Sequence, residues 1–192
     1  MRALGKDEKS VGPLTPVEAN NKMFRSLKNL QIDPHAPPPG VFVYSTETYY
    51  DQLDGQMLLH HPRYLILVER AQQLWFEQLL GAPRFDWQNF PDLYLVVRRL
   101  EIDYLESIAG VMPVHVVLWP GQLRAAKQET HFAFFSEDGK RLFCRGRRVN
   151  CKVDPKSHQP QIWTDTFMQR MHAELDKLQA PWRTRDSASP RK

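Results

Sequence analysis

Cysteine is scarce in this sequence, with Cys144 and Cys151 the two cysteines among 192 residues. They lie seven positions apart in one predicted strand, and an odd separation in a strand points side chains to opposite faces. We therefore expect neither a disulfide nor a shared metal site between them, and no further cysteine is available for a zinc centre. The scarcity suits a reducing compartment, and no metal is predicted.

Long apolar runs are also missing, and no segment is long enough to span a bilayer. The first ten residues, MRALGKDEKS, lack the apolar stretch of a secretory signal and carry acids, which transit peptides avoid. The predicted location is therefore cytoplasmic, without a membrane partner.

Charge of one sign is not concentrated in the middle of the chain. The formal net charge is +4, and part of it comes from Arg183, Arg185, Arg191 and Lys192. A nucleic-acid surface needs basic residues gathered on one folded face. No nucleic-acid partner is therefore predicted, and residues 181–192 are interpreted as a basic, solvated tail.

Residues 1–40 have few apolar side chains and contain six prolines. A short helix over residues 16–24, capped by Thr15, is predicted within this segment. The prolines at 37–39 act as a stiff spacer. We interpret the segment as a mobile extension that precedes the folded domain.

Residues 62–80 carry the strongest helical pattern. Pro62 suits the first helical position, and Gly81 suits the left-handed residue that follows a helix. The stretch 64–68 is apolar on every side, which predicts burial all round instead of along one stripe. A helix of this length and polarity is expected to form the centre of the domain.

Strands are predicted on both sides of this helix, because their residues are rich in β-branched and aromatic types and often alternate. They cover residues 41–50, 93–105, 111–119, 128–136 and 141–154, with a hairpin turn over 136–140. A last helix over residues 165–179 is capped by Thr164. Successive strands pair antiparallel, and a sheet that curls round the helix at 62–80 would bury it. The predicted fold class is α+β.

The stretch from Asp54 to Tyr64, DGQMLLHHPRY, followed by Glu-Arg-Ala at 69–71, resembles the 4-hydroxybenzoyl-CoA thioesterase family. In that family a loop aspartate precedes a small-residue turn and a His/Asn-x-x-Tyr-Leu pattern, which leads into Glu-Arg-Ala on the central helix. The resemblance covers residues 41–180. It implies the hotdog fold, in which an antiparallel sheet of five or slightly more strands wraps a long helix.

The resemblance also implies hydrolysis of an acyl-CoA or acyl carrier protein thioester, with no cofactor beyond the CoA thioester substrate. Active sites in the family form between subunits, which implies a homodimer or homotetramer. Pairing two sheets edge to edge would also bury an exposed strand edge.

Asp54 is the predicted catalytic carboxylate, either as the nucleophile or as a general base that activates water. The backbone amides of Arg63, Tyr64 and His61 are the candidates to polarise the thioester carbonyl, helped by the helix dipole. His61 is expected to donate to that carbonyl or to orient Asp54. Glu69 is a second acid, at a helical position that some hotdog enzymes use for the base.

Substrate binding is less well determined by the sequence. Arg145, Arg147 and Arg148 form a basic strand edge that could meet the CoA phosphates, and a solvated face is the alternative. Acyl-pocket depth depends on which of four helix residues face the groove, namely Leu65, Leu67, Val68 and Ala71.

Two observations keep other functions open. An aspartate before glycine is often a plain turn residue, and Gln56 and Met57 stand where many family members keep small residues. This departure motivates the alternative of a non-catalytic hotdog protein that binds an acyl ligand or a protein partner. A hydroxyacyl thioester dehydratase ranks last, because those enzymes resemble a different arrangement of His and Glu.

Overall fold

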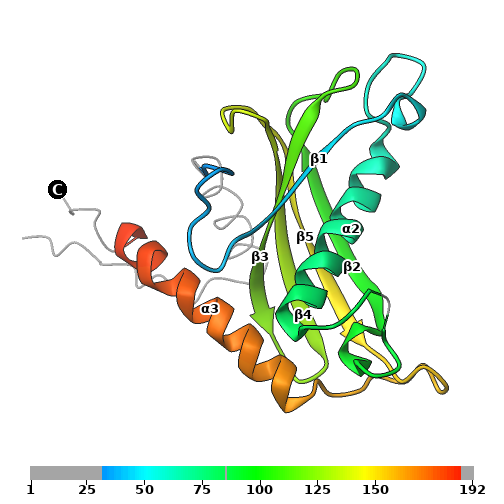
Figure 1. Cartoon of the computed structure of the whole chain (residues 1–192), viewed down its shortest axis with the longest axis vertical. Coiled ribbons are helices and arrows are strands. Elements are labelled where there is room, and N and C mark those ends of the chain that lie inside the picture. The colour runs from blue at the N-terminus through cyan, green and yellow to red at the C-terminus, as the bar shows by residue number, and fades with distance from the viewer. Residues whose placement is uncertain (1–31, 85, 187–192) are drawn as a thin grey trace, which may run out of the picture. The chain divides into compact units, whose positions relative to one another are not determined.

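The protein is described by a computed structural model over residues 32–84 and 86–186 (Figure 1). The strands in chain order are β1 (Phe42–Glu47), β2 (Leu95–Tyr104), β3 (Pro113–Leu123), β4 (Lys127–Ser136) and β5 (Leu142–Lys152). The helices are α2 (His61–Leu80) and α3 (Asp165–Asp186), with the short 3-10 helices η2 (Tyr50–Gln52) and η3 (Pro91–Leu93). Among these described residues, no helix has the length and apolar character needed to cross a membrane.

The five strands form one antiparallel sheet in the order β1-β3-β4-β5-β2. This confirms the predicted α+β class, with a sheet packed against the long helix α2 (Figure 1). The strands β1 and β2 lie at the two edges, and β5 is interior. The strand predicted at 111–119 continues to Leu123. Pro120 cannot donate a backbone hydrogen bond, and the pairing of β3 with β4 shifts in register directly after it.

One face of the sheet, here called the groove side, packs against α2. Its core is apolar and includes Val116, Leu118, Phe132, Phe134 and Cys144. The residues between them in the alternating register belong to the opposite, outer face. Both cysteines are free and buried.

The rotation of α2 is set by its apolar stripe. Leu67, Val68 and Ala71 are at most 1% exposed and face the sheet. Ile66, by contrast, is 37% exposed, so the prediction that residues 64–68 are buried on every side does not hold within one chain. The helix ends at Gly81, whose φ of 65° confirms the predicted left-handed cap.

The helix α3 begins where the sequence predicts, because the Phe167 amide donates to the Thr164 hydroxyl at 3.2 Å. Phe167 and Met171 are fully buried in the core that also holds Phe76. The helix continues past the predicted end at 179 and ends at Asp186.

The last residues of the proline-rich extension pack on the domain. Ile32 is 2% exposed, and a Cβ placed on Gly139 would lie 2.6 Å from Pro34. Gly139 has a φ of 69°, the left-handed conformation predicted for the hairpin turn. The helix predicted at 16–24, with its Thr15 cap, lies outside the described residues.

Candidate functional site

The loop that precedes α2 folds into a tight turn around Asp54. Its Oδ1 accepts hydrogen bonds from the amides of Gln56, at 2.8 Å, and Leu58, at 3.1 Å. The Asp54 amide donates to the Leu58 carbonyl at 2.8 Å, and the Met57 amide donates to the Asp54 carbonyl at 3.0 Å. Within the described part of the chain, Oδ2 of Asp54 accepts no hydrogen bond. One carboxylate oxygen therefore shapes the turn, and the other is left for a substrate or water.

Met57 holds the turn in a conformation that usually needs glycine. Its φ is 62°, and its side chain is exposed. The Gly110 amide donates to the Met57 carbonyl at 2.9 Å, and the Leu59 amide donates to the Ile108 carbonyl at 2.8 Å. These bonds to the β2–β3 loop fix the turn, so the bulkier residue at this position is accommodated without opening the loop.

The start of α2 supplies fewer free amides than the sequence predicts. The Arg63 amide donates to the carbonyl of His60, the N-cap residue, at 2.8 Å, so this predicted donor is already occupied. The His61 amide makes no hydrogen bond within the described residues, while the His61 carbonyl accepts one from Tyr104 Oη at 3.2 Å. Both His60 and His61 are exposed. The open amide at the helix start is therefore that of His61, next to an exposed imidazole.

Tyr64 belongs to the core. It is 3% exposed, and its hydroxyl accepts a hydrogen bond from the Ile108 amide at 3.4 Å. Burial raises the pKa of Tyr64 to about 12, so its side chain stays neutral at ordinary pH. Tyr64 thus anchors the helix start to the β2–β3 loop.

The three predicted arginines separate onto two faces, because β5 is an interior strand and its side chains alternate. Arg145 and Arg147 lie on the outer face, where they pair with Asp103 and Glu101 respectively. Arg148 lies on the groove side, 3.9 Å from Glu69. The predicted basic strand edge does not form, and the second acid meets one of the predicted substrate-binding residues instead.

The outer-face arginine Arg147 sits in a dense ionic network. It contacts Glu101 at 2.6 Å and Glu129 at 3.2 Å. His131 contacts Glu129 at 2.9 Å and stacks on Trp119. Burial alone would raise the pKa of Glu129, but the hydrogen bond from His131 and the charges of His131 and Arg147 outweigh it and lower that pKa. Arg147 thus pairs with two carboxylates inside this network, which is not part of the groove, while His131 Nδ1 has no hydrogen-bond partner among the described residues.

A cavity of about 190 Å³ lies on the groove side between α2, β5 and β2. Its apolar walls are Phe76, Trp87, Leu93 and Leu95, and polar groups of Glu69, Gln72 and Arg148 also face it. Asn150 Nδ2 donates to Gln72 Oε1 at 3.0 Å behind this wall. None of the four helix residues expected to set pocket depth lines it, because three of them face the sheet and Leu65 is partly buried elsewhere.

The polar side of this cavity was missed in the sequence, although a signal is present. Glu69, Gln73 and Glu77 follow at spacings of four on α2, with Gln72 beside them, and so share one side of the helix. Gln72 and Glu77 are buried. A row of polar residues next to an apolar stripe usually indicates a solvated face, which is why burial of this row could not be anticipated.

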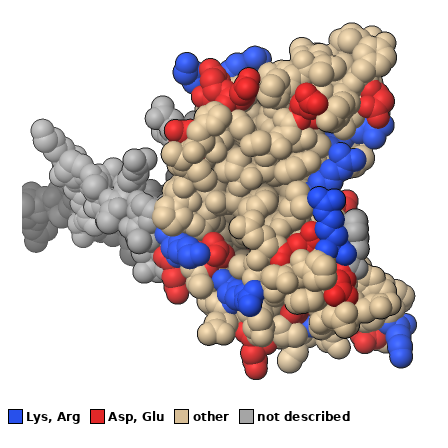
Figure 2. Space-filling view, in the orientation of Figure 1, with Lys and Arg blue, Asp and Glu red and all other residues tan. Residues whose placement is uncertain are grey.

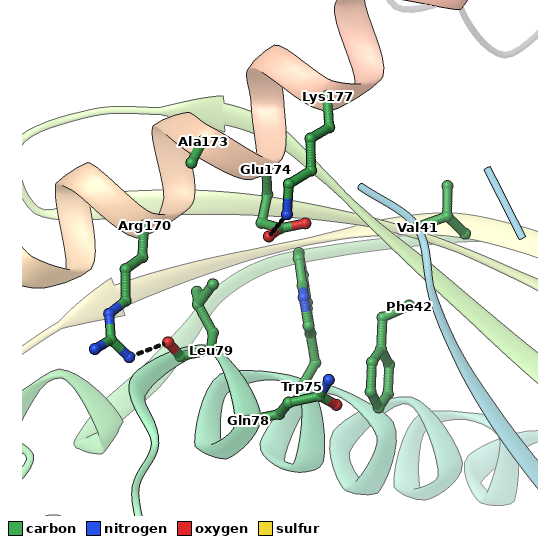
Figure 3. A pocket seen from close by; sticks show the side chains of 9 residues that line it. All are labelled: Val41, Phe42, Trp75, Gln78, Leu79, Arg170, Ala173, Glu174 and Lys177. Carbon is green, nitrogen blue, oxygen red and sulfur yellow. Dashed lines mark hydrogen bonds and ion pairs between the residues drawn. The ribbon is translucent and has the colours of Figure 1, made fainter. Parts of the chain in front are cut away.

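A second cavity, of about 410 Å³, lies between β1, the C-terminal half of α2, and α3 (Figure 3). Trp75, Phe42 and Leu79 give it an apolar floor. Its charged groups are engaged, since Lys177 Nζ pairs with Glu174 at 2.7 Å and Arg170 donates to the Leu79 carbonyl. It is remote from Asp54 along α2, and none of its described lining residues has a buried side-chain polar atom without a hydrogen-bond partner, so it is the weaker candidate.

Two further properties limit the chemistry. Within the described ranges, no three His, Cys, Asp or Glu side chains gather closely enough to hold a metal ion. On the face shown in Figure 2, acidic and basic side chains are interspersed and form no single basic patch.

The amino-acid sequence matches no protein-family model and no curated protein. Solved structures are similar to it in three dimensions. A DHNA-CoA thioesterase from Staphylococcus aureus is 20% identical with a TM-score of 0.58, over 79% of this chain and 97% of that one. A 1,4-dihydroxy-2-naphthoyl-CoA thioesterase from Synechocystis is 14% identical with a TM-score of 0.62, over 69% and 96% respectively.

A hypothetical protein from Staphylococcus aureus, solved in complex with CoA, is 13% identical with a TM-score of 0.65, over 74% of this chain and 88% of that one. Identities this low establish the architecture and no finer property. With its sheet order, central helix and these neighbours, the chain has the hotdog fold, in agreement with the resemblance seen in its sequence.

Proposed function

We propose that the protein is a thioesterase that hydrolyses an acyl-CoA, or an acyl carrier protein thioester, to the free acid and the thiol. The observation that carries the proposal is the position of Asp54. Its carboxylate lies in a fixed turn just before α2, and the amide of His61 begins that helix; neither Asp54 Oδ2 nor this amide has a hydrogen-bond partner in the part of the chain that the structure describes. A carboxylate beside a helix N-terminus is a suitable arrangement for attack on a polarised carbonyl.

Two routes use these groups. In the first, Asp54 Oδ2 attacks the thioester carbon, the thiolate leaves, and water then cleaves the mixed anhydride. In the second, Asp54 removes a proton from water, whose oxygen attacks the thioester carbon directly, and the tetrahedral intermediate then expels the thiolate. In both, the His61 amide donates to the developing oxyanion. Glu69, the second predicted acid, lies beside Arg148 at the cavity, about 12 Å along α2 from His61, so within one chain it takes no part in either route.

CoA is the preferred carrier in this proposal, because two of the similar structures are described as complexes with CoA. The three arginines predicted to contact the CoA phosphates do not lie where such contacts could form. Arg145 and Arg147 are paired on the outer face, and Arg148 lies inside the groove, so none of the three is retained as a phosphate contact. No cofactor or metal takes part in the proposed reaction.

A homodimer or homotetramer is also part of the proposal. The edge strand β2 spans ten residues and exposes Val96 and Val97 by 43% and 51%. Ile66 is exposed on the neighbouring side of α2. An unpaired strand edge with apolar side chains favours pairing with a second chain, and a partner on β2 would also cover Ile66 and the groove.

The test compares Asp54→Asn with wild type in steady-state hydrolysis of a panel of acyl-CoAs. Asparagine keeps an oxygen for the two turn amides but has no charge for attack or proton removal. We expect kcat/KM to fall by about a hundredfold or more. Asp51→Asn is the matched control, because Asp51 is an exposed acid in the same loop. Equal turnover by wild type and Asp54→Asn would remove Asp54 from this role.

The second candidate is a non-catalytic hotdog protein that binds an acyl ligand or a protein partner. It is favoured by the turn itself, in which Gln56 and Leu58 donate to Asp54 and an exposed Met57 replaces a small residue. Saturable binding of acyl-CoA without turnover by wild type would select this function.

A further inference from the structure

Arg148 is a buried cation whose hydrogen bonds are not completed by the protein. Only 9% of the residue is exposed, and its Nε has no hydrogen-bond partner in the described residues. Its ion pair with Glu69 is loose, at 3.9 Å, and the Glu69 side chain is 67% exposed to solvent. Burial lowers the pKa of Arg148, against the opposing effect of Glu69. A buried donor without an acceptor is costly to a fold and is rarely kept without a reason.

A second unmet group lies close by on the same strand. Asn150 is fully buried two residues further along β5, on the same face as Arg148. Its Nδ2 donates to Gln72, but its Oδ1 has no partner in the described part of the chain. Gln72 and Arg148 both line the 190 Å³ cavity. The polar wall of the cavity therefore has an unused donor in Arg148 Nε, facing the apolar walls, with a second unmet group behind it at Asn150.

The cavity lies along the same groove as Asp54. At one end of the groove, Tyr104 on β2 donates to the carbonyl of His61, which begins α2. Arg148 stands opposite Leu100 in the β2–β5 register, four residues from Tyr104 and so about 13 Å along the strand. On the helix, Glu69 lies eight residues after His61, which is about 12 Å. The distance measured along β2 and the distance measured along α2 therefore both place Arg148 about 12–13 Å from the start of the helix.

We propose that this cavity binds the far end of a medium-length acyl group, and that this end carries an oxygen acceptor for Arg148. The inference rests on the proposed thioesterase function, because it places the thioester carbonyl at the start of α2. The terminal oxygen accepts from Nε of Arg148, about 13 Å along the groove from the helix start, while Phe76, Leu93 and Leu95 line the part of the cavity beyond Arg148. A plain fatty acyl group of equal length would leave Nε buried without an acceptor.

The acceptor is a hydroxyl or a carboxylate. Glu69 and Glu77 also line the cavity, so its acids outnumber the one arginine and a neutral hydroxyl is the better match. Matched substrates separate the two: a medium-chain acyl-CoA, its ω-hydroxy analogue and its ω-carboxy analogue. For wild type we expect kcat/KM for an oxygenated substrate to exceed that for the plain one by about tenfold or more.

The decisive variant is Arg148→Met, which keeps the length and removes the donor. We expect the preference for oxygenated over plain substrate to fall to about one in this variant. The ratio of two kcat/KM values does not depend on the amount of folded enzyme, so a loss of stability does not disturb it. Arg147→Met is the control, because the neighbouring arginine is equally buried but lies on the outer face, and its ratio stays at the wild-type value.

Binding of the free acids gives a readout that does not need turnover. Calorimetric titration with the plain, ω-hydroxy and ω-carboxy fatty acids is expected to show the same preference, and its loss in Arg148→Met. Equal binding of plain and oxygenated acids by wild type, or an unchanged preference in Arg148→Met, overturns the assignment of the cavity. Failure of the proposed function is seen separately, as absence of hydrolysis of every acyl-CoA by wild type.

Discussion

Arg147 and Arg148 are neighbours on β5, equally buried and chemically identical, yet their surroundings differ completely. Arg147 makes two close ion pairs on the outer face, with Glu101 and Glu129. Among the described residues, Arg148 on the groove side has one loose ion pair and an Nε without a hydrogen-bond partner. Alternation along the strand is enough to place one in a closed network and the other beside a cavity.

The difference shows how structural charge and functional charge are told apart. A charge whose hydrogen bonds are met by the protein stabilises the native state, while a charge with unmet capacity costs stability until something binds. The loop before α2 also carries strain that lowers stability, because Met57, near Asp54, is held at a φ of 62°. Costs of this kind concentrate at sites of function.

The largest expected effect comes from removing the closed network's arginine. Arg147→Met removes the cation that joins Glu101 to Glu129 and leaves the two partly buried carboxylates with Arg99 and His131 respectively as their remaining partners. We expect the free energy of unfolding to fall by roughly 2–3 kcal/mol. This is at or below the usual cost of breaking a fully buried ion pair, because the Glu101 side chain is partly exposed to water. Arg148→Met is expected to change it by less than about 1 kcal/mol, since the methionine replaces an unsatisfied donor. Urea unfolding of both variants measures the difference.

Equal losses in the two variants would contradict the comparison, because they would mean that Arg148 is as well satisfied as Arg147. Arg99→Met serves as a reference for a surface arginine. Its side chain is 63% exposed, so its removal is expected to cost little.

The next effect is a dependence of stability on acid pH. The hydrogen bond from Arg147 lowers the pKa of Glu101, and His131 with Arg147 lowers that of Glu129 in spite of its burial. A folded-state pKa below the unfolded value means that the ionised form stabilises the fold. That contribution is present in full above the ordinary glutamate pKa of 4.5 and is lost as the pH falls through the lower folded values.

The double variant Glu101→Gln/Glu129→Gln isolates this effect. Its unfolding free energy is expected to fall less than that of wild type between neutral pH and pH values below about 4.5, because two of the linked groups no longer titrate. Exposed acids with lowered pKa values, such as Asp154 and Glu106, are present in both proteins and cancel in the comparison. Parallel pH curves for the two proteins would show that the network is not linked to folding.

The sequence predicts the fold well because its signals are local. Pro62 and Gly81 bound α2 to within one residue, and Thr164 caps α3 as expected. The candidate site is predicted only in part, since Asp54 can be found from its motif but its hydrogen bonds cannot. Whether the Arg63 amide is free depends on the N-cap geometry, and which arginine enters the groove depends on the register of β5 with β2. Both are set by tertiary contacts that no local pattern contains.

The smallest expected effect tests the strain at Met57. A side chain in the left-handed region costs about 1–2 kcal/mol. Glycine avoids this cost but destabilises the fold by roughly 0.5–1 kcal/mol, because its unfolded chain has more conformational entropy to lose. Met57→Gly is therefore expected to stabilise the protein by about 0.5–1 kcal/mol, because the Met57 side chain is 47% exposed and little packing is lost. Met57→Ala is the control, since it removes the same side chain but keeps the strained φ, and its stability should match wild type. Equal changes in unfolding free energy for Met57→Gly and Met57→Ala would mean that the backbone at Met57 is not strained. The contrast between the two faces of the sheet would then depend on Arg148 alone.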